Sequence, residues 1–326
     1  MKKTVTALAI AAAMGATSAH AADFKVNDAT TFSVYGNLQY IYIDQNNAAG
    51  DSESELTDNG STFGIEGEHK WDNGLTGYFR AEWEYRADEK EGDGGISGTD
   101  EVFAGIKGNF GTVQIGTWDG IFQDSISDPL NPFEATGMTE ANGDSEVGDQ
   151  IAYFSPSFGG FTFELQAAYE GDAADSGSSP YGDDSLGDGD STFQAVAKYT
   201  TDMFAVHLGY DDRGYEEDAD GNIGLTGVVN LAPVTLAAKL EQVGEDSAGN
   251  GEAQLYALTG SYDYGVGAVT AAVQEIDPDE GDGRTEFLIN ANYNVASNFY
   301  VYVEGGWLDK NEDADDYIST GAVYSF

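Results

Sequence analysis

The sequence predicts an all-β fold, a 16-stranded antiparallel β-barrel that spans a membrane, and three observations lead to this prediction. Apolar and polar residues alternate along many segments. Tight turns alternate with long acidic loops, and the chain stops on an aromatic residue at the end of an alternating run. Because successive residues of a strand point to opposite faces, these features indicate walls with one apolar and one polar side.

The first element is a leader. Lys2 and Lys3 precede an apolar run over residues 5–14, and Ala19-His20-Ala21 offers a small-residue cleavage site. This pattern is typical of a secretory signal peptide rather than a membrane helix. We therefore expect a cleaved signal peptide over residues 1–21 and one barrel domain over residues 22–326.

The charge of the chain limits its partners. Lys and Arg number 13 against 58 Asp and Glu, a net charge of −45, so we expect no binding to nucleic acid. The 17 Phe, 19 Tyr and 4 Trp argue against a disordered chain. There is no cysteine, so pairing and packing must hold the fold together.

The strand pattern is clearest between Leu75 and Arg86. The apolar parity holds Leu75, Gly77, Phe79, Ala81, Trp83 and Tyr85, and the polar parity holds Thr76, Tyr78, Arg80, Glu82, Glu84 and Arg86. Similar alternation occurs over residues 161–170, 204–211 and 286–293. These segments predict strands with one apolar face.

The connections follow a regular order. Tight turns are predicted at residues 72–74, 108–111, 157–160, 200–202, 231–233, 262–266 and 295–298. Longer acidic segments are centred near residues 50, 93, 134, 180, 217, 247, 280 and 312. An even strand number, with short turns at one end and long loops at the other, is typical of an outer-membrane barrel. A soluble β-sandwich is the alternative, but it does not explain the aromatic ends of the apolar faces or the polar, glycine-rich opposite faces.

Several segments resemble the Gram-negative general porins. They are FSVYGNLQYIYID, LTGYFRAEWEY, FAGIKGNFGTVQIG, SPSFGGFTF and the terminal GAVYSF, and together they extend over the mature chain. The resemblance implies an outer-membrane homotrimer with short periplasmic turns, long extracellular loops and a third loop folded into the barrel. It also implies that Tyr324 and Phe326 form the C-terminal signature read by the barrel-assembly machinery.

The longest loop runs from Asp119 to about Asp149 and is rich in acids. By resemblance it is the inward-folded third loop, and SDPLNPFE matches the tip of that loop, with Asp128 and Glu134 at the acidic positions. The predicted constriction residues are Asp119, Asp124, Asp128, Glu134 and Glu140. The alternative is that these acids only solvate an exposed loop.

The predicted pore wall departs from the family pattern. General porins commonly place basic residues opposite the third loop, whereas the matching positions here are Asn37, Thr62 and Asp100. Arg80 and Arg86 remain on the inward parity, beside Glu82 and Glu84, with which we expect them to pair. A lumen biased in this way favours cations.

Other functions find less support in the residues. The mature chain holds only His69 and His207 and lacks the G-x-S-x-G and H-E-x-x-H motifs, so we expect no enzyme, no cofactor and no discrete metal site. A phosphate channel would need basic rings, which the sequence lacks. A substrate-specific sugar channel is the alternative; it would need an aromatic track, and Tyr78, Tyr300 and Tyr302 lie on the expected inward parity without forming one. We expect passage of small hydrophilic solutes and cations, and contacts with lipopolysaccharide and outer-membrane lipid, including diffuse Ca²⁺ or Mg²⁺. Gly36 and Gly67 are compatible with close subunit packing.

Overall fold

The computed structural model describes residues 22–46, 51–90, 95–140, 147–169, 191–214, 219–245, 251–308 and 316–326. The predicted signal peptide lies outside these residues. Among them, no helix combines the length and apolar character needed to cross a bilayer.

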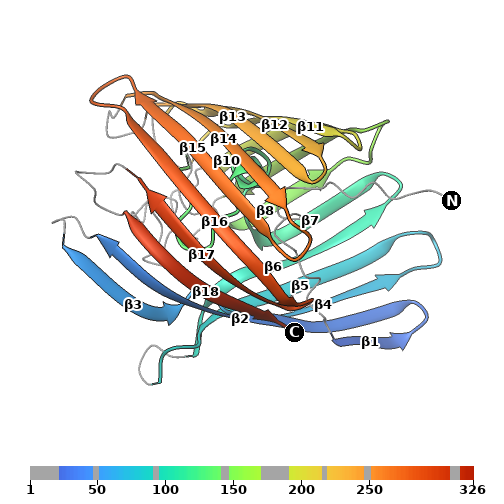
Figure 1. The fold of residues 1–326 in the computed structure, drawn as a ribbon. Helices are drawn as coiled ribbons and strands as arrows, with labels where there is room; N and C mark the ends of the chain where they lie inside the picture. Colours follow the sequence, from blue (N-terminus) through green and yellow to red (C-terminus); the bar gives the residue numbers. More distant parts are fainter. Residues whose placement is uncertain are drawn as a thin grey trace.

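Eighteen strands form one antiparallel sheet that closes on itself (Figure 1). The first nine are β1 (Ala22–Asn27), β2 (Thr30–Asn46), β3 (Ser52–Asp58), β4 (Thr62–Lys70), β5 (Thr76–Arg86), β6 (Gly95–Gly108), β7 (Gly111–Trp118), β8 (Val147–Phe154) and β9 (Phe161–Tyr169). The others are β10 (Ser191–Thr200), β11 (Phe204–Asp211), β12 (Asn222–Leu231), β13 (Val234–Val243), β14 (Ala253–Asp263), β15 (Ala268–Pro278), β16 (Arg284–Ala296), β17 (Phe299–Trp307) and β18 (Tyr317–Ser325). Two short helices, α1 (Ile121–Ile126) and η2 (Asp128–Leu130), lie between β7 and β8.

These strands occupy 16 positions around the wall, which confirms the predicted barrel. β3 and β4 share one position, because β2 pairs with β3 through its second half and with β4 through its first half. β1 and β18 share another, because β18 pairs with β2 from Asn37 onward while β1 pairs with Thr30–Val34. The hairpin strand β1 was not predicted.

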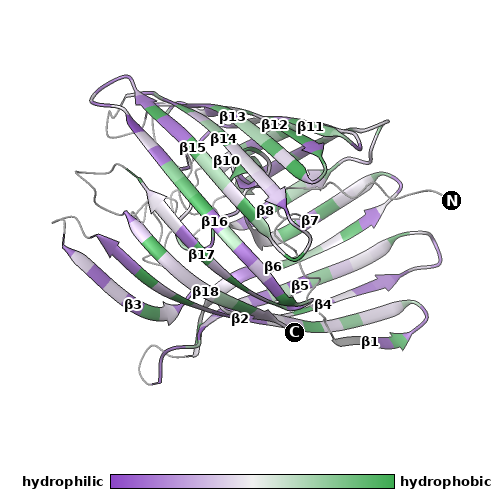
Figure 2. Cartoon of the chain, viewed as in Figure 1, coloured by the Kyte–Doolittle hydropathy of each residue, from purple (hydrophilic) through white to green (hydrophobic). Residues whose placement is uncertain are grey.

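The exposed and buried residues are reversed relative to a soluble protein. On β16, Phe287 is 42% exposed whereas its neighbours Glu286 and Leu288 are fully buried. On β12, Leu225 is 41% exposed and Thr226 is buried. Figure 2 shows the resulting alternation of hydrophobic and hydrophilic bands along the strands. An apolar outer band around a polar interior suits a barrel surrounded by lipid, in which every strand is paired and no edge remains.

The connections divide between the two ends of the barrel as predicted. The seven tight turns lie at the end where the chain terminates, between β4 and β5, β6 and β7, and each later pair in that series. The longer connections lie at the other end. The loop after β7 is shorter than predicted, because β8 begins at Val147.

Candidate functional site

The loop between β7 and β8, called loop 3 below, enters the barrel and follows its inner wall (Figure 1). Its helix α1 packs against β9 to β12, and η2 packs against β13 and β14. The apolar side of α1 faces the wall, with Phe122 1% and Ile126 0% exposed. Gly209 and Gly224 of the wall face Ile126, and a Cβ added at Gly209 would lie 2.9 Å from its Cγ1. The wall is therefore flat where the helix rests on it.

Side chains of the wall satisfy the free carbonyls at the end of α1 and in η2. Thr226 Oγ1 donates to Ile126 O at 2.6 Å, and Thr259 Oγ1 donates to Leu130 O at 2.7 Å. Because the last carbonyls of a helix lack partners within it, these hydroxyls replace water at a buried helix end. Loop 3 is thereby held against the wall along β12 to β14.

Two buried carboxylates hold the second half of loop 3. Glu304 of β17 accepts hydrogen bonds from Glu134 N at 2.8 Å and Ala135 N at 3.0 Å. Glu286 of β16 accepts from Thr139 N at 2.8 Å and Thr139 Oγ1 at 2.5 Å. Both carboxylates are almost fully buried. Sequence reasoning placed Glu286 on a polar face but gave neither residue a role.

The predicted acids of α1 and η2 lie on the lumen side of loop 3. Asp124 and Asp128 are exposed, although their neighbours Ser125, Ile126 and Ser127 are buried. Enclosure within the barrel, followed by the charge of Asp128, raises the pKa of Asp124. Enclosure and the charge of Asp119 likewise raise the pKa of Asp128. The two carboxyl groups and Asp119 form one electrostatically coupled acidic face.

Glu134 and Glu140 occupy more enclosed positions in loop 3. Tyr300 Oη donates to Glu134 Oε1 at 2.8 Å, and Asn131 Nδ2 donates to Glu140 Oε1 at 2.7 Å. Burial raises the pKa of Glu134 to about 7, and the charge of Glu304 adds to this effect while the Tyr300 hydrogen bond opposes it. Burial also raises the pKa of Glu140 to about 7, with the charge of Asp128 adding to it.

The wall opposite loop 3 brings together three further predicted acids. A bulge in the pairing of β5 with β6 occurs at residues 100–101, and Asp100 interacts electrostatically with Glu82, Glu84 and Asp119. Tyr35 Oη donates to Glu82. Asp119 directly follows β7, which pairs with β6, so these wall acids act on the start of loop 3 along neighbouring strands.

The other predicted wall positions are uncharged or peripheral. Asn37 Nδ2 donates to Thr62 Oγ1 at 2.9 Å, and Thr62 N donates to Asn37 Oδ1 at 3.2 Å, so these residues form a polar pair. Arg86 is exposed at the loop end of β5, where it interacts electrostatically with Asp88.

The predicted pairing of Arg80 with Glu82 and Glu84 is wrong. Arg80 instead binds Glu101 at 2.7 Å and Glu66 at 3.2 Å, because cross-strand neighbours reach its guanidinium more directly than residues of its own strand. The sequence analysis also missed four inward cations, each of which lies beside an acid. One is Lys107, whose Nζ lies 2.8 Å from Glu68, and the other three lie on later strands. They are Lys198 with Glu164 at 2.8 Å, Lys239 with Glu241 at 2.8 Å and Arg284 with Glu286 at 3.3 Å.

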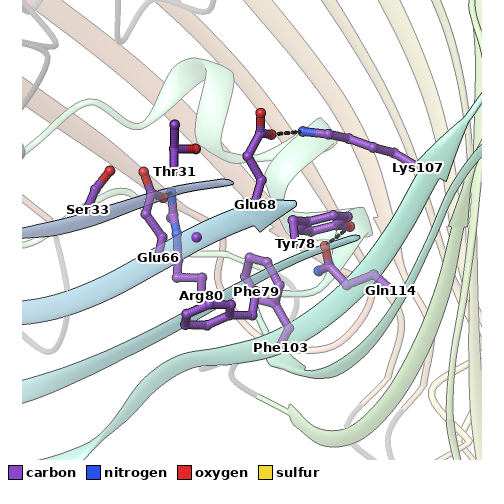
Figure 3. A pocket seen from close by; sticks show the side chains of 11 residues that line it. Thr31, Ser33, Glu66, Glu68, Tyr78, Phe79, Arg80, Phe103, Lys107 and Gln114 are labelled. Carbon is purple, nitrogen blue, oxygen red and sulfur yellow. Dashed lines mark hydrogen bonds and ion pairs between the residues drawn. The ribbon is translucent and has the colours of Figure 1, made fainter. Parts of the chain in front are cut away.

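A cavity of about 500 Å³ opens into the lumen on the side of β2 and β4 to β7 (Figure 3). Its lining includes the rings of Tyr78 and Phe103, whose centroids lie 6.1 Å apart. Sequence reasoning placed Tyr78 on the inward face without assigning it to a cavity. Phe103 could have been recognised as inward-facing, because it lies four residues before Lys107 on β6 and both side chains therefore point to the same face.

The C-terminus lies beside the first half of the barrel. Phe326 N donates to Gly36 O at 2.9 Å and Gly36 N donates to Phe326 O at 3.1 Å, while Tyr324 is 45% exposed on the outer face. The ring of Phe326 lies over Gly36, and the ring of Phe79 lies over Gly67. Rings of this chain thus lie beside both glycines, and subunit packing near Gly36 and Gly67 stays a prediction.

The described residues contain no group of three or more His, Asp or Glu side chains arranged to hold a metal ion. These residues instead surround an acidic passage. It is formed by a closed wall, a loop fixed across part of the interior, and carboxylates on both the loop and the wall. Such an arrangement can admit water and small polar solutes.

Comparisons with known proteins agree with this geometry. A family model described as Gram-negative porin matches residues 5–314. A monosaccharide porin of a Halomonas species and the major outer membrane protein of Halomonas elongata are each 32% identical over the full length of both chains. An anion-selective porin from Comamonas acidovorans superposes with a TM-score of 0.73 at 18% identity, covering 91% of this chain and 100% of that one.

A Salmonella typhi porin, OmpF in complex with daunomycin, superposes with a TM-score of 0.72 at 19% identity, covering 93% of this chain and 100% of that one. At these identities the structural matches show the fold, and the fold alone does not set ion preference. The family match and the full-length relatives show more: this chain belongs to the Gram-negative porin family and is an integral β-barrel of the outer membrane.

Proposed function

We propose that this porin is a non-enzymatic, cation-preferring diffusion channel for small hydrophilic solutes and ions. The observation that carries the proposal is that its inward-facing cations are paired with carboxylates. Arg80, Lys107, Lys198, Lys239 and Arg284 each lie within 3.3 Å of a carboxylate. Their positive charge is locally balanced and contributes little field to the lumen.

The acids of loop 3 and of the facing wall then dominate the electrostatic potential. Two unit charges about 4 Å apart interact by ~4 kcal/mol at an effective dielectric constant of 20, against ~1 kcal/mol in bulk water. A narrow passage through a low-dielectric wall focuses this field, so Asp124 and Asp128 attract cations and repel anions when ionised, which for Asp124 requires a pH above its raised pKa of about 8. The net charge of −45 extends the same bias to the mouths of the channel.

The experiment is a reversal-potential measurement across a planar bilayer with a KCl gradient. The wild type should prefer K⁺, and Asp124→Asn/Asp128→Asn should lose a large part of that preference. Glu280→Gln, in the exposed connection between β15 and β16, is the matched control and should retain it. Anion preference in the wild type contradicts the proposal. Equal selectivity in the wild type and the double variant places the preference elsewhere in the lumen.

The expected assembly is a homotrimer inserted by the barrel-assembly machinery, with Tyr324 and Phe326 as its recognition signature. A solved porin of Vibrio cholerae that superposes with a TM-score of 0.68 is described in a trimer form, which supports this proposal. The acidic outer loops suit diffuse Ca²⁺ or Mg²⁺ bridges to lipopolysaccharide. Cross-linking and size measurement of the detergent-solubilised protein test the trimer.

A sugar-specific channel is the second candidate function. The name of the full-length Halomonas relative, a monosaccharide porin, favours it. The cavity on the side of β2 and β4 to β7, which is lined by the rings of Tyr78 and Phe103, favours it too. Liposome swelling separates the two candidates. A general diffusion channel admits neutral solutes in order of size, whereas a specific one admits a preferred sugar faster than smaller polyols.

A further inference from the structure

We infer that the cavity on the side of β2 and β4 to β7 is a binding subsite for a neutral, ring-shaped polyhydroxylated solute, the chemistry of a monosaccharide. This inference rests on the proposed channel function and names a solute class and a place for it. The cavity measures about 500 Å³, within the ~300–1,000 Å³ typical of small-molecule sites.

The first support is the charge balance of the lining. The cavity is lined by Glu66 and Glu68 together with Arg80 and Lys107, so two negative groups meet two positive ones. Arg80 binds Glu66 at 3.2 Å, and Lys107 binds Glu68 at 2.8 Å (Figure 3). An ionic solute would have to break these pairs to bind strongly. A neutral solute can use their remaining donor and acceptor sites without breaking them.

The second support is the density of hydrogen-bonding groups. Thr31, Ser33 and Gln114 line the same cavity, and Gln114 Oε1 accepts from Tyr78 Oη at 2.8 Å. This bond fixes the amide of Gln114 in one orientation, since its oxygen is the acceptor and its nitrogen is left to donate. Hydroxyl groups, which both donate and accept, match a lining of fixed carboxylates, amide and hydroxyls.

The third support is an apolar surface beside these polar groups. The rings of Tyr78 and Phe103 meet edge to face with an interplanar angle of 73°, and Phe103 meets Trp118 at 86°. The Trp118 ring is itself buried, which fixes the position of Phe103. Arg80 Cζ lies 6.0 Å from the Phe103 ring centroid and Lys107 Nζ lies 5.3 Å from the Tyr78 ring centroid, so a solute has to pack on the parts of these rings that the two cations leave uncovered. A pyranose ring has C–H groups that can do so, whereas an open-chain polyol has no rigid face. The subsite should therefore distinguish a ring from a chain of similar size.

The test compares D-glucose with sorbitol on single channels of the purified wild-type protein in planar bilayers. Glucose should reduce the ion current in a saturable manner and sorbitol should do so much less. Phe103→Leu, which keeps apolar volume without a ring, should weaken the glucose effect about two- to tenfold. Phe103→Tyr should restore it. Phe193→Leu, at a 40% exposed position on the outer face, is the matched control and should behave as the wild type.

The outcomes separate the subsite from the channel proposal. Cation-preferring channels on which glucose and sorbitol act alike, or on which Phe103→Leu has no effect, overturn the subsite and leave the channel. An amino acid such as alanine that blocks more strongly than glucose overturns the assigned solute class. Anion-preferring channels with a glucose block dependent on Phe103 overturn the selectivity and retain the subsite, and a protein without conductance overturns both.

Discussion

Replacing Glu304 by glutamine should release the middle of loop 3 from the barrel wall. Glu304 accepts four hydrogen bonds while only 3% exposed. Oε2 accepts from Glu134 N at 2.8 Å and Asn290 Nδ2 at 2.7 Å, and Oε1 accepts from Ala135 N at 3.0 Å and Tyr317 Oη at 2.7 Å. A glutamine keeps one oxygen and presents an NH₂ group to the other two donors.

The cost follows from this count. If the NH₂ group takes the place of Oε1, the Tyr317 hydroxyl can accept from it and donate to Thr136 O, so only Ala135 N of loop 3 loses its acceptor, at about 1–3 kcal/mol. This loss opposes the docked state, and ~1.4 kcal/mol corresponds to a tenfold change in an equilibrium. The released population of residues 132–137 should therefore rise by about fivefold or more.

Single-channel recording measures this release. Loop 3 lies against the wall in the docked state, so its release should add brief closures and lower the mean conductance of Glu304→Gln. Thr139 remains bound to Glu286, so the barrel should still fold and insert. Glu280→Gln, an exposed control of the same chemistry, should conduct like the wild type. If Glu304→Gln shows wild-type conductance and current noise while folding normally, the docking role assigned to Glu304 is wrong.

Three other predictions address the titration and the packing of the lumen. Because burial raises the pKa of Glu134 and Glu140 to about 7, both should be largely neutral at pH 6 and charged at pH 8. Cation preference in reversal-potential measurements should therefore rise with pH over this range, and a flat profile would contradict this prediction. Since a raised carboxyl pKa means that the folded state holds the proton more tightly, their protonation should favour loop docking below about pH 7, and this contribution should be lost as pH rises through that value. Gly36→Val places a side chain against Thr62 O and the Phe326 ring, so it should impair barrel closure and lower the temperature at which the folded band is lost in heated gel electrophoresis. Gly224→Val meets Ile126 and should lift α1 from the wall, which would appear as a lower conductance with normal heat resistance of the barrel.

The strands of the barrel wall could be predicted because each one is specified by the alternation of apolar and polar residues within its own sequence. The alternation between Leu75 and Arg86 corresponds to β5, and the tight turns predicted from short glycine-, asparagine- and proline-containing segments lie between the strands expected. Strand β1 alternates between apolar and polar residues, but its six residues are too few for a membrane-spanning strand, and it was therefore missed. It forms where β18 ends beside Gly36 and leaves Thr30–Val34 of β2 without a partner, an edge that a short hairpin can cover.

The course of loop 3 depends on distant contacts and could not be predicted from residue patterns alone. Glu134 and Glu304 are separated by 170 residues, and Thr139 and Glu286 by 147. Resemblance predicted that the loop folds inward, but not which wall it follows. Nor did any pattern indicate that Asn59, at the interruption between β3 and β4, would donate to Glu134 O at 2.7 Å. Such contacts require both partners to be positioned by the closed barrel.

The lysines beneath loop 3 show why the electrostatic argument needed the structure. Sequence reasoning inferred a negative lumen from the lack of basic residues at Asn37, Thr62 and Asp100, yet Lys198 and Lys239 lie on the wall that loop 3 covers. Lys239 is 2% exposed, and its Nζ contacts Glu241 at 2.8 Å and donates to Ser127 Oγ at 3.2 Å. A buried cation beside a buried carboxylate adds little net field at the lumen, because the two charges act as a short dipole. In the proposed channel, both lysines already have a carboxylate partner, so they offset little of the negative charge on the lumen face of loop 3.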